Sequence, residues 1–156
     1  MKKILISLAL LLVFTGCGEK EIVLDLEKVE IELNDLEITE DEESVKLFEN
    51  NTKMSNDAIE GRQIDTNLFE EILFSMDMTS NSANIYIITL PKEGNEEECD
   101  EQIDNYLDKY EDNVEMYNPE EAKKIEERLE ETYGNYHIYI ISKDNAKVLD
   151  KIKTTK

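Results

Sequence analysis

The chain has 156 residues, with 38 acidic side chains against 17 basic ones and a formal net charge of −21. Nucleic-acid-binding proteins hold phosphate with Lys and Arg, so this charge excludes that class of protein. Two cysteines and one histidine are too few for a disulfide-rich miniprotein or an ordinary zinc site. The length suffices for one domain with its own hydrophobic core.

The N-terminus has the pattern of an export signal. Lys2 and Lys3 make it basic, and residues 4–14 are almost wholly apolar. Eleven helical residues rise only about 16 Å, roughly half the thickness of the hydrocarbon core of a membrane. That is the length of a signal-peptide core rather than of a transmembrane helix. We therefore expect residues 1–16 to be a signal peptide.

Phe14-Thr15-Gly16-Cys17 resembles the lipobox of bacterial lipoproteins, although that family favours Leu where Phe14 stands. The resemblance implies cleavage before Cys17 and diacylation of its thiol. Two acyl chains hold a protein stably on a membrane. We therefore expect a lipid anchor, such as palmitate, at Cys17 on the extracytoplasmic side of the cell membrane. An ordinary signal peptide with an incidental cysteine, or an uncleaved anchor, is the alternative.

Residues 17–60 form an acidic N-terminal segment. From Glu19 onward it holds fifteen acidic residues and four basic ones. Residues 22–26 and 29–33 alternate apolar and acidic side chains with a period of two, which is typical of half-buried strands. The alternation predicts weak edge strands or, alternatively, an extended arm that orders on a partner.

The rest of this segment predicts little regular structure. Residues 39–50 predict a short helix, because Thr39 can cap it and Glu42 stands three positions later. Residues 50–61, which are rich in Asn, Ser and Asp, predict a loop.

Residues 61–156 predict an α+β domain. A short helix capped by Asp65 or Thr66 is expected to run into a strand near 72–78. The β-branched and aromatic runs at 84–90 and 136–141 predict the central strands of a small sheet.

Three amphipathic helices are expected to pack on this sheet, near 95–117, 119–132 and 143–153. The first carries one continuous apolar stripe from Cys99 to Tyr117. The last belongs to a tail that has five lysines and a net charge of +3, so we expect it to lie against acidic neighbours.

A spaced set of short motifs resembles a known family. The set comprises Met76-Asp77-Met78, residues 82–85, residues 117–121, residues 133–136 and residues 140–144. The family consists of small, uncharacterised lipoproteins of Gram-positive bacteria with a domain of unknown function, and the likeness covers about Gly61 to Ile152 together with Gly16-Cys17. It implies an α+β fold and an exported location, and it carries over no catalytic residue. In that family the stretch before the Gly-Asn turn is often a strand, whereas this sequence looks helical, so residues 128–133 stay open between the two.

Few residues point to chemistry. The sequence has no nucleophile elbow, Walker loop or dinucleotide-binding glycine pattern. His137 lies in a predicted core strand, where we expect a structural or hydrogen-bonded role. Carboxylates surround Cys99 and disfavour a thiolate, so it is expected to be a small buried helix residue. Asp108 to Asp112 departs from the EF-hand pattern, with Asn113 where Gly belongs.

We therefore predict no enzyme, no catalytic residue, no cofactor and no metal site. The favoured function is a membrane-anchored, non-catalytic binding or accessory module, whose partner is a basic envelope protein or peptide. The alternatives are a calcium-binding or envelope-stress accessory protein and an unrecognised envelope hydrolase.

Overall fold

The computed structural model describes residues 22–79 and 82–155, and these residues form an α+β fold. The predicted signal peptide and Cys17 lie outside the described residues. Within them, one antiparallel sheet has the strand order β3-β4-β5-β7-β6. Its strands are β3 (Asn51–Lys53), β4 (Phe69–Asp77), β5 (Ile85–Pro91), β6 (Leu129–Tyr133) and β7 (Tyr136–Ile141).

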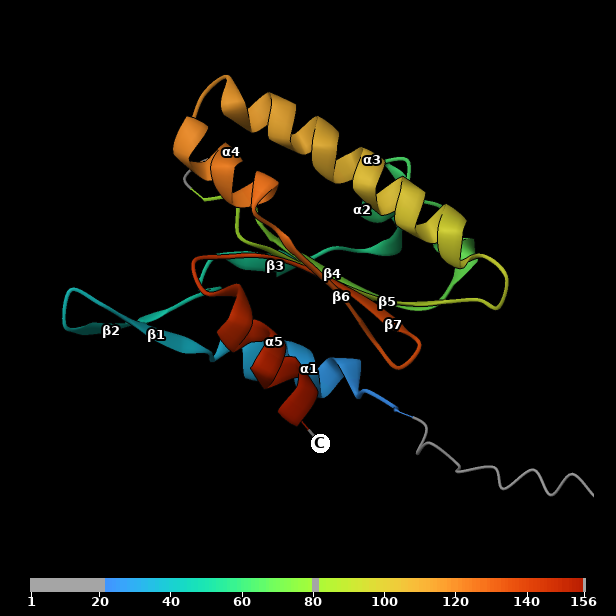
Figure 1. The fold of residues 1–156 in the computed structure, drawn as a ribbon, viewed down its shortest axis with the longest axis horizontal. Helices are drawn as coiled ribbons and strands as arrows, with labels where there is room; N and C mark the ends of the chain where they lie inside the picture. The colour runs from blue at the N-terminus through green and yellow to red at the C-terminus, as the bar shows by residue number, and fades with distance from the viewer. Residues whose placement is uncertain (1–21, 80–81, 156) are drawn as a thin grey trace, which may run out of the picture.

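The sheet is the middle layer of three (Figure 1). Helices α3 (Glu96–Glu115) and α4 (Pro119–Glu126) cover one face, together with the short α2 (Asn56–Glu60). Cys99, Ile103 and Leu107 of α3 are fully buried against this face. The stripe predicted on the long helix is therefore its core side as far as Val114, whereas Tyr117 lies beyond the end of α3 and is 86 % exposed.

The other face is covered by the two ends of the described chain, α1 (Leu26–Asn34) and α5 (Asn145–Thr154). Val29 and Leu33 of α1 and Val148 and Ile152 of α5 are all fully buried in one cluster with the strands. The acidic N-terminal segment is thus an integral part of the core.

The predicted elements with the strongest patterns are confirmed. β5 and β7 lie next to each other inside the sheet, with Ile85 opposite Ile141 and Ile87 opposite Tyr139. Both are buried on their two faces, as their unbroken apolar sequence requires. The helices expected near 95–117 and 143–153 are α3 and α5.

The strand predicted at 29–33 is wrong, because these residues belong to helix α1. Val29 and Leu33 are four residues apart, so a helix places both on one face, where they are buried. Ile31, the third apolar residue of the alternation, is 64 % exposed. Asp25 starts the helix by accepting a hydrogen bond from the Lys28 amide at 3.1 Å. Residues 22–25 also form no strand, although Leu24 is buried.

The helix predicted at 39–50 is also wrong. These residues contain most of a hairpin of β1 (Glu37–Glu40) and β2 (Glu43–Lys46), with Ile38 opposite Val45. Asp41 and Glu42 make the turn with positive φ angles of 47° and 71°, which a helix does not allow. The loop predicted at 50–61 contains β3 and α2.

The helix predicted to run to residue 132 ends at Glu126, and residues 129–133 are strand β6. Pairing with β7 decides the outcome, since Leu129 lies opposite Ile140 and Tyr133 opposite Tyr136. The short helix expected before residue 72 is a single 3₁₀ turn, Thr66–Leu68, capped by Asp65, and β4 already starts at Phe69.

Helix α5 lies against acidic residues, as its charge predicted. Lys151 Nζ of α5 lies 3.1 Å from Glu32 Oε2, and Lys143, which precedes the helix, contacts Glu40. Lys147 Nζ donates to the main-chain oxygen of Glu37 at 2.8 Å. These contacts join the C-terminal helix to the N-terminal segment. Among the helices that the structure describes, none is both long enough and apolar enough to cross a membrane.

Candidate functional site

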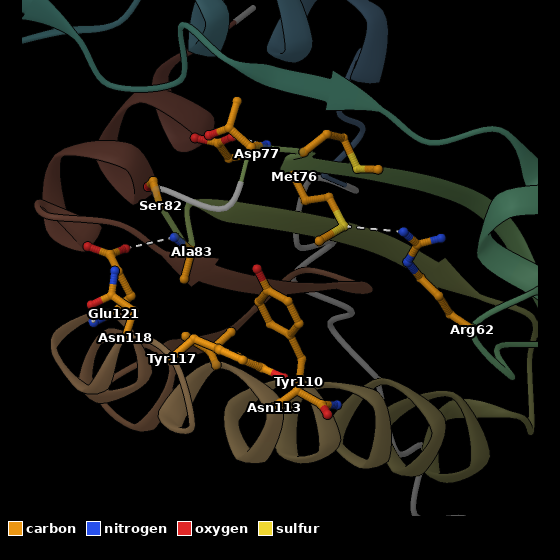
Figure 2. Close-up of a pocket in the computed structure, with 13 residues that line it drawn as sticks. Arg62, Met76, Asp77, Ser82, Ala83, Tyr110, Asn113, Tyr117, Asn118 and Glu121 are labelled. Carbon is orange, nitrogen blue, oxygen red and sulfur yellow. Dashed lines mark hydrogen bonds between the residues drawn. The ribbon is translucent and has the colours of Figure 1, made fainter.

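A cavity of about 350 Å³ opens at one end of the sheet, where β4 ends and where α3 turns into α4 (Figure 2). We call it the α3–α4 pocket. Its size is typical of sites that bind a small ligand or a side chain. It is lined by Arg62, Met76, Asp77, Met78, Thr79, Ser82, Ala83, Tyr110, Asn113, Val114, Tyr117, Asn118 and Glu121.

The pocket exists because the helical layer reaches past the end of the strands. α3 has 20 residues, and Asn118 caps α4 by accepting a hydrogen bond from the Glu121 amide at 3.4 Å. This corner holds Tyr117 over the end of β4, and Val114 of α3 lines the same space. The rim is apolar as well: Met78 is 57 % and Tyr117 86 % exposed.

One wall of the pocket is built from aromatic rings and sulfur. The rings of Tyr106 and Tyr110 stack with centroids 6.0 Å apart, and Phe74 meets Tyr106 edge-on at 5.5 Å. The Arg62 guanidinium carbon lies 5.9 Å from the Tyr106 ring centroid, within the range of cation–π attraction. Met76 Sδ accepts weak hydrogen bonds from Arg62 and from the Tyr106 hydroxyl. These contacts fix the positions of the side chains in this wall, which therefore presents aromatic rings and sulfur, both polarisable, to the pocket.

The opposite wall carries two carboxylates (Figure 2). Glu121 is neutralised, because Oε2 accepts from Lys124 Nζ at 2.6 Å and from the Ala83 amide at 2.7 Å. Asp77 is only 5 % exposed and accepts a hydrogen bond from the Thr79 amide at 2.7 Å. Its carboxylate makes no ion pair with any residue in the described part of the chain. Asp77 also lines a neighbouring cavity together with Lys46, Lys124 and Lys143, but none of these lysines forms an ion pair with it. A buried carboxylate without a direct ion pair is costly, so a positively charged group in the pocket would stabilise Asp77.

Tyr110 stands between the two walls, with its hydroxyl directed away from α3 and into the pocket (Figure 2). Burial, together with the nearby Tyr106, Asp77 and Glu121, raises the pKa of this hydroxyl to about 12. No hydrogen-bond partner for it is found within residues 22–79 and 82–155. The hydroxyl therefore stays protonated and can donate to or accept from a ligand.

A second polar cluster lies beneath the first half of α3. Asp100 Oδ1 accepts a hydrogen bond from the Tyr139 hydroxyl at 2.6 Å and lies 2.6 Å from His137 Nδ1. Burial and the hydrogen bond to Asp100 raise the pKa of Tyr139, so it remains a donor. His137 is hydrogen-bonded, as expected for this residue. In the described residues no hydroxyl or thiol side chain hydrogen-bonds its ring.

Arg128 completes this cluster. It contacts Glu130 Oε1 at 2.7 Å and Asp108 Oδ1 at 3.2 Å, and it lies 3.7 Å from Asp104 Oδ1. Burial raises the pKa of Asp104, and Glu130 raises it further. The cluster ties α3 to β6 and β7 by charge, which is a structural use of these acids.

The remaining predicted residues take ordinary places. Cys99 is fully buried, and burial together with Asp100 raises the pKa of its thiol to about 11, so it is a core residue as predicted. In the part of the chain that the structure describes, no three His, Cys, Asp or Glu side chains are grouped to hold a metal ion. Cys17 lies outside that part.

Residues 43–142 match a family described as a domain of unknown function (DUF4358). The chain belongs to this family. The DUF4358 match spans the five-stranded sheet, α3 and α4, and with them both the α3–α4 pocket and the Asp100 cluster. It leaves out α1, β1 and α5, so the elements that cover the other face of the sheet lie outside it. No curated protein and no solved structure matches the chain.

The sequence did not point to the pocket. Met76, Asp77 and Tyr110 were assigned to a strand and to a core stripe, which is where they are. Asp77 is the one available signal, because an acid follows the mainly apolar residues 72–76 in the second half of β4. Its meaning depends on its burial beside the pocket without a direct ion pair, which only the folded chain shows.

Proposed function

We propose that this chain is a membrane-anchored extracytoplasmic lipoprotein that acts as a non-catalytic binding module. In this proposal the α3–α4 pocket receives a lysine or arginine side chain from an extracytoplasmic protein or peptide. The buried, unpaired carboxylate of Asp77 in an apolar pocket is the observation that carries it.

The pocket complements such a side chain along its whole length. Lysine and arginine have an apolar stem and a charged head, and they bury the stem wherever the head finds a polar partner. Val114, Met76 and the Tyr110 ring offer apolar surface for the stem. The Asp77 carboxylate and the Tyr110 hydroxyl offer acceptors for the head. The exposed Met78 and Tyr117 at the rim suit apolar residues that flank the basic one.

The charge of the whole chain supports the same partner. Cleavage before Cys17 removes two lysines and leaves side chains with a formal charge of −23. Such a field steers a basic partner toward the protein and raises the association rate at low ionic strength. The general field attracts any cation, whereas the Asp77 carboxylate selects one that fits the pocket.

Selection of random phage-displayed peptides on the full chain tests the pocket. We expect the selected peptides to be enriched in Lys or Arg beside an apolar residue. A fluorescent copy of a selected peptide should bind D77N at least tenfold more weakly, because the charge-assisted contact is worth about 1.5–3 kcal/mol. D112N is the matched control: Asp112 is an exposed acid on α3, and its loss should change affinity less than twofold.

Two outcomes would contradict the pocket assignment: selected peptides without basic residues, or D77N and D112N weakening binding equally. The second would mean that the net charge alone attracts the peptides. Circular dichroism melting checks that D77N stays folded. For the anchor, C17A should abolish labelling with radioactive palmitate, and labelling that survives this substitution would refute lipidation of Cys17.

A further inference from the structure

The first described residues pack at the end of the sheet that carries the β6–β7 turn. The Leu24 amide donates a hydrogen bond to the Tyr136 hydroxyl at 3.3 Å, and the Leu24 side chain is buried. Ile22 lies against the turn itself: a Cβ added to Gly134 would stand 2.9 Å from Ile22 Cβ. Gly134 also has a φ of +62°, so glycine is required there for two reasons. The chain thus enters the fold beside this turn (Figure 1).

The α3–α4 pocket lies at the opposite end of the sheet. Met76, at the pocket, pairs with Ile85, which pairs with Ile141 at the far end of β7. The six residues of β7 separate this end from the β6–β7 turn by about 20 Å. A different cavity, lined by Glu93, Glu96 and Gly134 among others, occupies the turn end.

The distance from the proposed anchor to the fold is short. Five residues lead from Cys17 to Ile22, and a fully extended chain of that length spans at most about 18 Å. With Cys17 in the bilayer, the β6–β7 end is therefore confined near the membrane surface. The pocket could approach that surface only if the link ran at full extension back along the sheet.

From this placement we infer that the lipid-anchored protein holds its β6–β7 end toward the bilayer and opens its α3–α4 pocket away from it. The pocket then receives peptide segments from the extracytoplasmic space rather than lipid. The acids of the turn end, including Glu93 and Glu96, repel anionic headgroups, so the short link holds this end near the surface without adsorption. The inference rests on the proposed anchor at Cys17.

Quenching of two fluorescent labels by the membrane tests the orientation. The full lipidated chain is labelled through N135C at the turn or M116C near the pocket, and is placed in phosphatidylcholine vesicles that carry nitroxide on their headgroups. Both positions are exposed, whereas Cys99 is fully buried and Cys17 is blocked by lipid. We expect headgroup quenching at residue 135 to exceed that at residue 116 at least twofold, with equal quenching of both by a soluble quencher.

A longer link provides the matched control. Twenty Gly and Ser residues inserted between Glu19 and Lys20 give a flexible chain with a mean span near 28 Å, so the ratio of the two quenching values should fall toward one. Equal quenching without the insertion, or stronger quenching at residue 116, would overturn the orientation while leaving the anchor and the pocket in place. Failure of palmitate to label Cys17 would instead overturn the anchor and the orientation together.

Discussion

The two faces of the sheet are covered in different ways. On one face α1 and α5 bring the two ends of the described chain together over a mainly aliphatic cluster, and ion pairs such as Lys151–Glu32 lie at its margin. On the other face α3 packs an apolar stripe over its middle, but it also covers the Asp100–His137–Tyr139 cluster and leaves the α3–α4 pocket open at its end. The closed face provides stability, and the incompletely covered face provides the candidate site.

The largest expected effect lies on the closed face. L33A removes a fully buried side chain of α1 and should lower the free energy of unfolding by about 2–5 kcal/mol, measured by urea denaturation. I31A on the same helix is the control, because Ile31 is 64 % exposed and its loss should cost less than about 0.5 kcal/mol. Equal small effects would mean that α1 does not contribute to the core.

On the open face, D100N tests the polar cluster. Asparagine keeps the shape of Asp100 but loses the charge that accepts from the Tyr139 hydroxyl beside His137 Nδ1, so the free energy of unfolding should fall by about 1–2 kcal/mol. D112N, an exposed acid on the same helix, should be neutral within about 0.5 kcal/mol. If the two variants unfolded at the same urea concentration, the cluster would add nothing to the packing of α3.

Alkaline pH should weaken the open face more than the closed one. Burial raises the pKa of Cys99 from about 9.0 to about 11, so its contribution to stability is complete below pH 9 and is lost as the pH rises through 11. Tyr106, Tyr110 and Tyr139 on the same face also have raised pKa values, as does Tyr86 on the other face.

Hydrogen exchange at pH 8 and pH 10.5 measures this difference. Protection should fall first in α3, and C99A should reduce the change between the two pH values. Earlier loss of protection in α1 and α5 would contradict this assignment. At pH 8 a thiol reagent should modify Cys99 only in urea, because the side chain is fully buried in the native state.

The smallest effect is expected for the ion pairs at the margin of the closed face. K151Q removes the contact with Glu32, in which both side chains are partly exposed, and should lower the free energy of unfolding by less than about 1 kcal/mol. The difference between K151Q and the parent chain should shrink further in 0.5 M salt. A loss comparable to that of L33A would mean that charge, rather than apolar packing, holds α1 and α5 together.

The sequence was most informative where a pattern was long or apolar on both sides. The apolar stripe of α3 and the strands β5 and β7 are predicted directly by their apolar residues, because these side chains are stable only when they are buried. Short segments are ambiguous. Over only five residues, the spacing of Val29, Ile31 and Leu33 is compatible with a strand and, through Val29 and Leu33, with one face of a helix. At residues 129–133 the local helical preference of glutamate was outweighed by pairing with β7.

The sequence by itself determined the α+β class, the two inner strands, the long helix and the basic character of the last helix, because hydrophobic periodicity and charge are local properties. Only the tertiary structure decided that residues 22–60 join the core, and that Asp77 is buried without a direct ion pair beside a pocket at one end of the sheet. Burial and pairing depend on residues distant in the chain, such as Tyr136 against Leu24 and Tyr110 across from Asp77. No local pattern encodes those neighbours, so the candidate site emerged only from the fold.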